Sequence, residues 1–152
     1  MFKADRVSYR LVSFDYLKAR AINLASLDLD NFYRQIFVVK NSATGEEIPF
    51  TGLAYTSPNG KIIDSYAFYV QGRRQGQFAR FYPSGMLHKF GNQQGNCADG
   101  VWYEFYESGA LQKIAVFAMG TCLASHEYDE SGVMTAEQVE DDLGRLLRSL
   151  VI

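Results

Sequence analysis

One short phrase recurs between Gly52 and Gly132, and an internal repeat constrains the fold more strongly than any other feature of this sequence. Two sets of glycines mark the repeat. Those that open a unit are 24 residues apart, and those that close it are 25, 24 and 23 residues apart. The opening glycines are Gly52, Gly76 and Gly100, and the closing ones are Gly60, Gly85, Gly109 and Gly132. The chain therefore contains three repeats and part of a fourth.

Each unit predicts a β-hairpin. The closing glycine follows Pro-Asn, Pro-Ser or Glu-Ser, which are turn sequences because glycine accepts positive φ and these residues favour the preceding turn positions. An aromatic-rich run precedes each complete turn, and an apolar residue lies two positions after every closing glycine: Ile62, Leu87, Leu111 and Met134. This order is strand, turn, strand. Gly76 and Gly100 are expected at the joints between hairpins.

The aromatic residues keep the same phase in successive units. Phe78 and Trp102 lie seven residues before their turn glycine, and Phe81, Phe105 and Tyr128 lie four before it. Equivalent aromatics should therefore form rows across the sheet. A platform that stacks nucleic-acid bases is one interpretation. We favour a shared core, because the rows recur at the period of the repeat.

The best-formed unit reads Gly-Val-Trp-Tyr-Glu-Phe-Tyr-Glu-Ser-Gly-Ala-Leu, from Gly100 to Leu111. It resembles the MORN repeat in its bacterial variant, Gly-x-Trp-x-x-Tyr-Tyr-x-x-Gly-x-Leu, and the unit from Gly76 to Leu87 differs by Phe78 in place of Trp. The preceding Pro-Phe-Thr-Gly-Leu-Ala is similar to the lead-in of bacterial MORN-type antitoxin or immunity-like proteins. The resemblance covers residues 44–134. It implies a mainly β fold, an antiparallel sheet of stacked hairpin repeats.

The whole chain, 1–152, is expected to form a single domain. Residues 1–43 would supply N-terminal strands or a cap, with strands at 6–12 and 35–40, while 14–29 fits either a strand or a helix. The strand expected at 62–70 is apolar on both faces, so the N-terminal segment should cover one of them.

After the last turn the pattern becomes helical, and residues 135–152 predict a C-terminal helix. Thr135 to Gln138 fits an N-cap with a capping box. Apolar residues then follow at helical spacing: Val139, Leu143, Leu146, Leu147 and Leu150. We expect this helix to cap the open end of the sheet; a dimerisation or partner-binding helix is the alternative.

No catalytic constellation is present, so we do not expect an enzyme, a metal or a cofactor. The two histidines are 38 residues apart, and the glycine-rich segment 91–100 lacks the Gly-Lys-Ser/Thr of a phosphate loop. Cys97 and Cys122 occupy like positions two strands apart, beyond disulfide reach, and should be free thiols. No apolar run is long enough for a membrane span, and no signal peptide is indicated. We therefore expect a cytoplasmic protein.

Charge is distributed unevenly although the net charge is only −2. Residues 61–89 carry five bases against Asp64 alone: Lys61, Arg73, Arg74, Arg80 and Lys89. Residues 99–142 carry ten acids against one base, Lys113, a net charge of −9. This acidic end is either a solvated face or a binding surface for a basic partner.

Two functions follow from these observations. The first is a bacterial immunity or antitoxin protein that neutralises a cognate toxin by protein–protein binding, with an acidic surface that could mimic nucleic acid towards a basic toxin such as a nuclease. The contact residues expected are Asp99, Tyr103, Glu104, Glu107, Asp129 and Glu130. Nucleic acid itself is not expected as a partner. The alternative is a MORN-type scaffold or anionic-lipid-surface module that uses Arg73, Arg74, Arg80 and Lys89.

Overall fold

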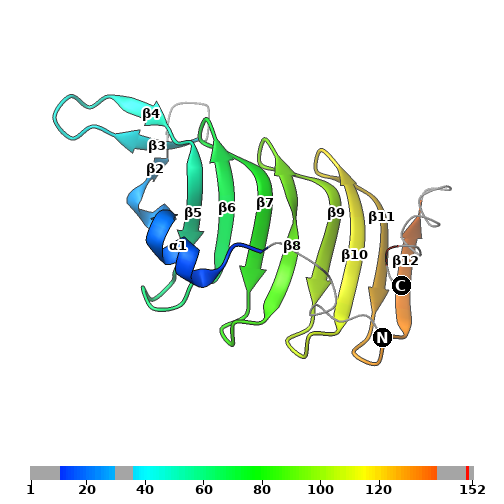
Figure 1. The fold of residues 1–152 in the computed structure, drawn as a ribbon. Helices are drawn as coiled ribbons and strands as arrows, with labels where there is room; N and C mark the ends of the chain where they lie inside the picture. Colours follow the sequence, from blue (N-terminus) through cyan, green and yellow to red (C-terminus); the bar gives the residue numbers. More distant parts are fainter. Residues whose placement is uncertain (1–10, 30–35, 140–149, 151–152) are drawn as a thin grey trace.

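A nine-stranded sheet forms the body of the protein, and a three-stranded sheet lies beside one end of it (Figure 1). The computed structural model describes residues 11–29, 36–139 and Leu150. The large sheet has the order β1-β5-β6-β7-β8-β9-β10-β11-β12, and the small one β2-β3-β4. All neighbouring strands are antiparallel except β1 and β5, which are parallel. The mainly β architecture expected from the sequence is confirmed, with this one parallel pair as a difference.

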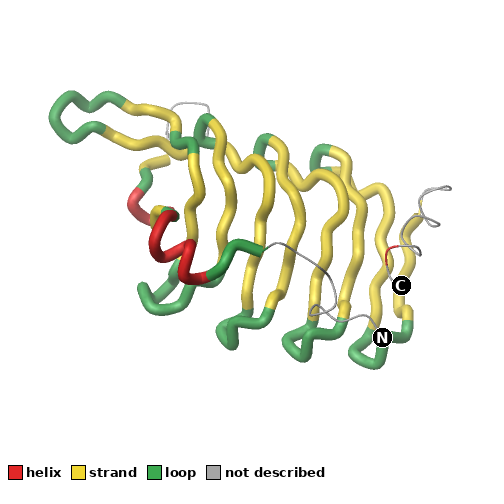
Figure 2. The backbone as a smooth tube through the Cα atoms, in the orientation of Figure 1, coloured by secondary structure: helices red, strands yellow, loops and turns green. Residues whose placement is uncertain are grey.

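The element bounds follow the chain in order. The N-terminal part contains α1 (Phe14–Arg20), β1 (Ile22–Asn23), the 3-10 helix η2 (Leu24–Ser26), β2 (Asp28–Leu29), β3 (Phe37–Lys40) and β4 (Glu47–Pro49). The remaining strands are β5 (Gly52–Thr56), β6 (Ser65–Val70), β7 (Arg73–Phe81), β8 (Leu87–Gln94), β9 (Cys97–Phe105), β10 (Leu111–Ala118), β11 (Thr121–Tyr128) and β12 (Met134–Val139). The turns lie at the two ends of the strands, and so form two opposite borders of the large sheet (Figure 2).

The two aromatic rows lie on opposite faces of the sheet, because their phases differ by three residues. Phe81 and Phe105 belong to the core cluster that also contains Leu17 of α1, and Tyr128 packs against it. We call this side the α1 face. Phe78 and Trp102 lie on the other side, the back face, with ring centroids 5.6 Å apart. The interpretation of the rows as core is confirmed.

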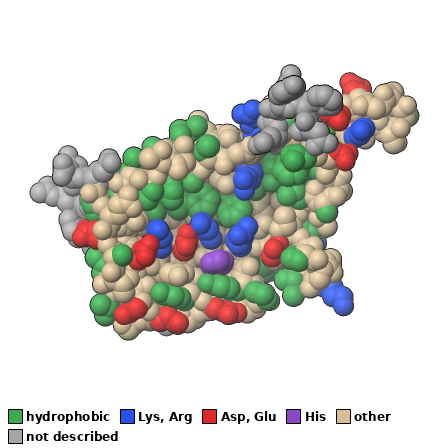
Figure 3. All heavy atoms as spheres, turned by 180° about the vertical axis from the view of Figure 1, so that it is seen from behind, with side chains coloured by type: hydrophobic (Ala, Val, Ile, Leu, Met, Phe, Trp, Pro, Cys, Tyr) green, Lys and Arg blue, Asp and Glu red, His purple; other side chains and the backbone are tan. Residues whose placement is uncertain are grey.

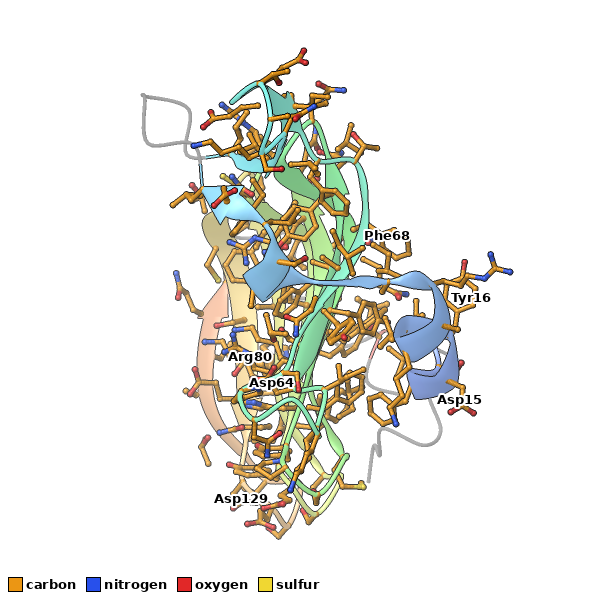
Figure 4. The ribbon with its side chains drawn as sticks, turned by 90° about the vertical axis from the view of Figure 1, so that its left-hand side faces the viewer. Asp15, Tyr16, Asp64, Phe68, Arg80 and Asp129 are labelled. Carbon is orange, nitrogen blue, oxygen red and sulfur yellow. The ribbon has the colours of Figure 1, made fainter. Side chains whose placement is uncertain are left out.

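The N-terminal segment covers both faces at the β5 end of the sheet. Helix α1 begins after Ser13, whose side chain accepts a hydrogen bond from the Tyr16 backbone N–H, and its Leu17 is fully buried on the α1 face. The chain then passes β1 at the sheet edge, and Leu24 and Leu27 pack against the back-face cluster. Figure 4 shows α1 and the following segment on opposite sides of the sheet. The expected cover on one face is therefore present on both.

Several local expectations need correction. The strand expected at 6–12 lies mostly outside the described residues, and Leu11 and Val12 are not in a strand. The ambiguous segment 14–29 contains both helix and short strands, and residues 62–64 precede β6 rather than belonging to it. Of the apolar residues after the turns, Leu87 and Leu111 are buried, whereas Ile62 and Met134 are exposed.

The predicted capping box at Thr135 to Gln138 is wrong, because these residues form β12 in an antiparallel pair with β11. The turn closed by Gly132 thus starts a full hairpin, and backbone hydrogen bonds to β11 outweigh the local helical preference. Residues 140–149 and 151–152 of the predicted helix lie outside the described part of the chain. Leu150, which is helical, packs against Ile114 and Ala124.

Gly76 and Gly100 lie inside β7 and β9, not at the joints between hairpins as expected. Their φ values are +99° and +81°, and each lies opposite a register shift in the ladder to the preceding strand. A bulge needs a residue that tolerates positive φ, which explains the recurrence of glycine at this position. The joints themselves are at Gln71, Asn96 and Met119, which have positive φ.

A tyrosine follows the second conserved-phase aromatic residue in two of the repeats, as Phe81-Tyr82 and Phe105-Tyr106. This tyrosine links its hairpin to the next one. The Tyr82 hydroxyl donates to the Phe105 carbonyl at 2.8 Å, and the Tyr106 hydroxyl donates to the Tyr128 carbonyl at 2.9 Å. Because the two hydrogen bonds join corresponding positions of successive repeats, they should stabilise the contacts between successive hairpins equally.

Replacing Tyr106 with phenylalanine is expected to lower the free energy of unfolding by about 1 kcal/mol, the typical value for one hydrogen bond. Urea denaturation would measure it, with Tyr16→Phe as the control, because the exposed Tyr16 phenol makes no hydrogen bond within the described residues. Equal stability of the two variants would contradict this role.

Candidate partner-binding surface

Three hairpin turns with the same geometry lie side by side at one end of the strands. We call this border of the large sheet the turn edge. In each, the first residue donates its N–H to the carbonyl four residues later, and the glycine donates back to the first residue. The turns are 82–86, 106–110 and 129–133, and their glycines have φ of +86°, +86° and +88°. Positions in one turn therefore correspond directly to positions in the next.

Glu107 and Glu130 occupy the same position in adjacent turns, two residues before the glycine, and both are exposed. Adjacent hairpins are two strand spacings apart, so the two carboxylates project from points about 9–10 Å apart. Pro83 fills this position in the first turn. Acidic side chains gather along this edge in Figure 3.

Asp129 lies in the same turn as Glu130 but is engaged within it. Its carboxylate accepts hydrogen bonds from the Ser131 hydroxyl and from the backbone N–H groups of Ser131 and Val133. These hydrogen bonds lower the pKa of the Asp129 carboxyl, and the bond from the Ser131 hydroxyl makes the largest contribution to the shift. Its role is to stabilise the turn, and Figure 4 shows it at this edge.

Negatively charged side chains are concentrated at the turn edge, namely Glu107, Asp129 and Glu130. The pKa of the Tyr82 phenol is raised, first by burial and then by the negative charges of Glu107, Glu104 and Glu130. Apolar side chains are exposed beside these acids. Met86 and Val133 lie in the turns and Met134 begins β12, with exposed fractions of 41%, 60% and 42%. An apolar centre with a polar rim is the usual arrangement of a protein-binding surface.

Glu104 belongs to a different surface, a row of charged side chains across the back face (Figure 3). It forms an ion pair of 2.6 Å with Lys89, and Lys113 forms one of 2.9 Å with Glu127. The Glu127 hydrogen bond is the main cause of the raised pKa of Lys113. Arg80, opposite Lys89 in the ladder, extends the row. Glu104 is therefore largely neutralised.

The remaining two predicted contact residues lie elsewhere. Asp99 is near the opposite edge, where its carboxylate accepts a hydrogen bond from the Met119 N–H at 3.1 Å. Tyr103 is on the α1 face, stacked on Phe105 with ring centroids 6.3 Å apart. The six residues predicted as one surface are thus divided among two edges and two faces. Only Glu107, Asp129 and Glu130 come together.

The sequence itself carries a signal for the charged row. Lys89, Glu104, Lys113 and Glu127 are cross-strand neighbours in successive strands. Alternating signs at equal distances from successive turns predict such pairs. The bases proposed for a lipid surface are similarly dispersed: Lys89 and Arg80 lie on the back face, and Arg73 and Arg74 begin β7 after the Gln71 joint.

Within the described residues, no group of three or more His, Cys, Asp or Glu side chains could hold a metal ion. Both cysteines are free thiols, as expected. Among the helices that the structure describes, none is long and apolar enough to cross a membrane. No family model, curated protein or solved structure matches this chain.

Proposed function

We propose that this protein is a bacterial immunity or antitoxin protein that neutralises a cognate toxin by binding it directly through the turn edge. The observation that carries the proposal is the pair of exposed carboxylates of Glu107 and Glu130 at equivalent turn positions, beside exposed Met86 and Val133. The resemblance of residues 44–134 to MORN-type antitoxin and immunity-like proteins supports it. The partner would present a basic surface with an apolar centre.

The physical mechanism is occlusion with electrostatic guidance. Negative potential along the edge accelerates encounter with a basic surface and orients it. Burial of the apolar turn residues would then slow dissociation. A toxin whose active site is basic, such as a nuclease, would be blocked because the acidic edge competes with its substrate.

The first experiment is purification of the tagged protein from its native cytoplasm, with bound polypeptides identified by mass spectrometry. We expect one stoichiometric partner that is toxic when produced alone. A preparation without such a partner that sediments with anionic liposomes, but not with neutral ones, would overturn the proposal and favour the scaffold or lipid-surface alternative.

The second experiment reverses Glu107 and Glu130 to lysine together. We expect the association rate with the toxin to fall about tenfold or more at low salt, the difference to shrink as salt rises, and protection of cells to weaken. The control is Glu46→Lys with Glu47→Lys, two exposed acids next to the β3–β4 turn, which changes the net charge equally. Equal rates for the two double variants would show that the turn edge is not the contact surface.

A further inference from the structure

A groove runs between α1 and the first long strands of the sheet, on the α1 face. It is lined by Leu11, Val12, Ser13, Tyr16, Arg20, Gly52, Leu53 and Phe68. Its floor is the cross-strand pair of Leu53 and Phe68 from β5 and β6, and its wall is the side of α1 that carries Tyr16 and Arg20. None of these residues belongs to the turn edge.

The wall is held firmly against the sheet. The Val12 N–H donates to the Tyr66 hydroxyl at 3.0 Å just before the helix, and Leu17 is fully buried in the α1-face core. The Phe14 ring meets Phe81 edge-on with ring centroids 5.0 Å apart. The groove is therefore preformed, which reduces the entropic cost of binding a ligand.

Large apolar side chains are exposed in and beside the groove. Phe68 is 37% exposed in the floor and Tyr16 is 54% exposed in the wall. Figure 4 shows both on the same side of the sheet, away from Arg80 and Asp64. Val70, which follows Phe68 on the same face of β6, is also exposed. Aromatic side chains at a concave surface can bury a large apolar group of a ligand.

Arg20 gives the groove its charge. It lies four residues after Tyr16, on the same side of α1, and in the described part of the chain no carboxylate comes within 4.0 Å of its guanidinium. A guanidinium at the rim of an apolar groove complements a carboxylate attached to an apolar group. Arg20 is the one charged residue in the groove lining, and a single cation does not suit a nucleic-acid backbone, which needs several.

We propose that this groove binds an extended segment of a partner polypeptide in which a large apolar side chain lies next to a carboxylate. The apolar side chain covers Leu53 and Phe68 beside Tyr16, and the carboxylate pairs with Arg20. This is a second interaction surface, separate from the turn edge and on the α1 face, so it does not depend on toxin neutralisation.

The test titrates the full-length protein with three capped peptides: acetyl-Gly-Phe-Asp-Gly-amide, its Asn analogue and its Ala-Asp analogue. Two-dimensional NMR reports which backbone amides shift. We expect the Phe-Asp peptide to shift the amides of Leu53, Phe68 and Arg20 saturably. The Asn analogue should bind about threefold to fivefold more weakly, as expected for a partly exposed ion pair, and the Ala-Asp analogue should not bind measurably.

Variants assign each contact. Arg20→Gln should reduce the affinity for the Phe-Asp peptide to that for the Asn analogue and leave binding of the analogue unchanged. Arg80→Gln, an exposed base on the back face, is the control and should change neither. Phe68→Ala should abolish binding of both peptides.

Three outcomes would overturn the proposal: no saturable shifts at the groove, equal affinity for the Asp and Asn peptides, or an Arg20→Gln variant that binds as the unaltered protein does. Sedimentation with anionic vesicles that is lost in Phe68→Ala would instead assign the groove to a membrane surface. The turn-edge reversals leave the peptide titration unaffected, so failure of one proposal is distinguishable from failure of the other.

Discussion

Replacing Gly91 with alanine is expected to destabilise the protein by about 3 kcal/mol, because the site has no room for a methyl group. A Cβ at Gly91 would lie 2.3 Å from Cδ2 of Trp102 and 2.5 Å from its Cε2. The indole has little freedom to move. Its Nε1 donates to the Asn92 carbonyl at 2.9 Å, and Phe78 and Phe117 pack against it.

The cost is steric rather than conformational, since Gly91 does not have positive φ. Urea denaturation would measure it, with Asn92→Ala as the control, an exposed position in the same strand expected to change stability by less than about 0.5 kcal/mol. Trp102→Leu should remove part of the clash, so the double variant should be more stable than the sum of the single effects predicts, by about 1 kcal/mol. Strict additivity would show that the two residues do not interact.

Phe105→Ala is expected to have an effect of similar size on the α1 face, a loss of about 3–5 kcal/mol. Phe105 is fully buried in the cluster that joins α1 to the sheet. Truncation leaves a cavity bounded by strands that cannot close over it, because the ladder holds their spacing. A loss of this size is a large fraction of the stability of a domain, about 5–15 kcal/mol.

The matched control for this variant is Phe68→Ala on the same face. Phe68 is 37% exposed, so its truncation should cost only about 1 kcal/mol and leave a folded protein for the peptide titrations. Thermal unfolding followed by circular dichroism would compare the two. Similar melting temperatures would contradict the placement of Phe105 in the core.

Turns and aromatic rows were predictable from the sequence, because both depend on residues close together in the chain. The turns at 82–86, 106–110 and 129–133 follow from a glycine and its two preceding residues, and their common φ values confirm it. Trp102 and Phe105 were assigned to different rows by their distance from the same glycine. Because the same spacing recurs in successive units, each unit supports the assignment made for the others.

The candidate surface was less predictable. Glu104 and Glu107 are three residues apart, yet Glu104 pairs with Lys89 across the ladder and Glu107 projects from a turn. Bulges shift the register, so the face on which a side chain lies depends on the neighbouring strand as well as on parity. The Asp129 carboxylate also accepts hydrogen bonds within its own turn, and its being an acidic residue did not by itself indicate this.

By itself, the sequence determined a mainly β chain with tight turns at fixed intervals and aromatic side chains in two phases. These features arise from local backbone preference and from the alternation of side chains along a strand. The tertiary structure alone decided that Thr135 to Gln138 extends the sheet as β12, that residues 14–29 wrap one end of it on both faces, and which acids remain unpaired. In each of these cases the local preference is weak, and hydrogen bonds and burial contributed by distant strands determine the outcome.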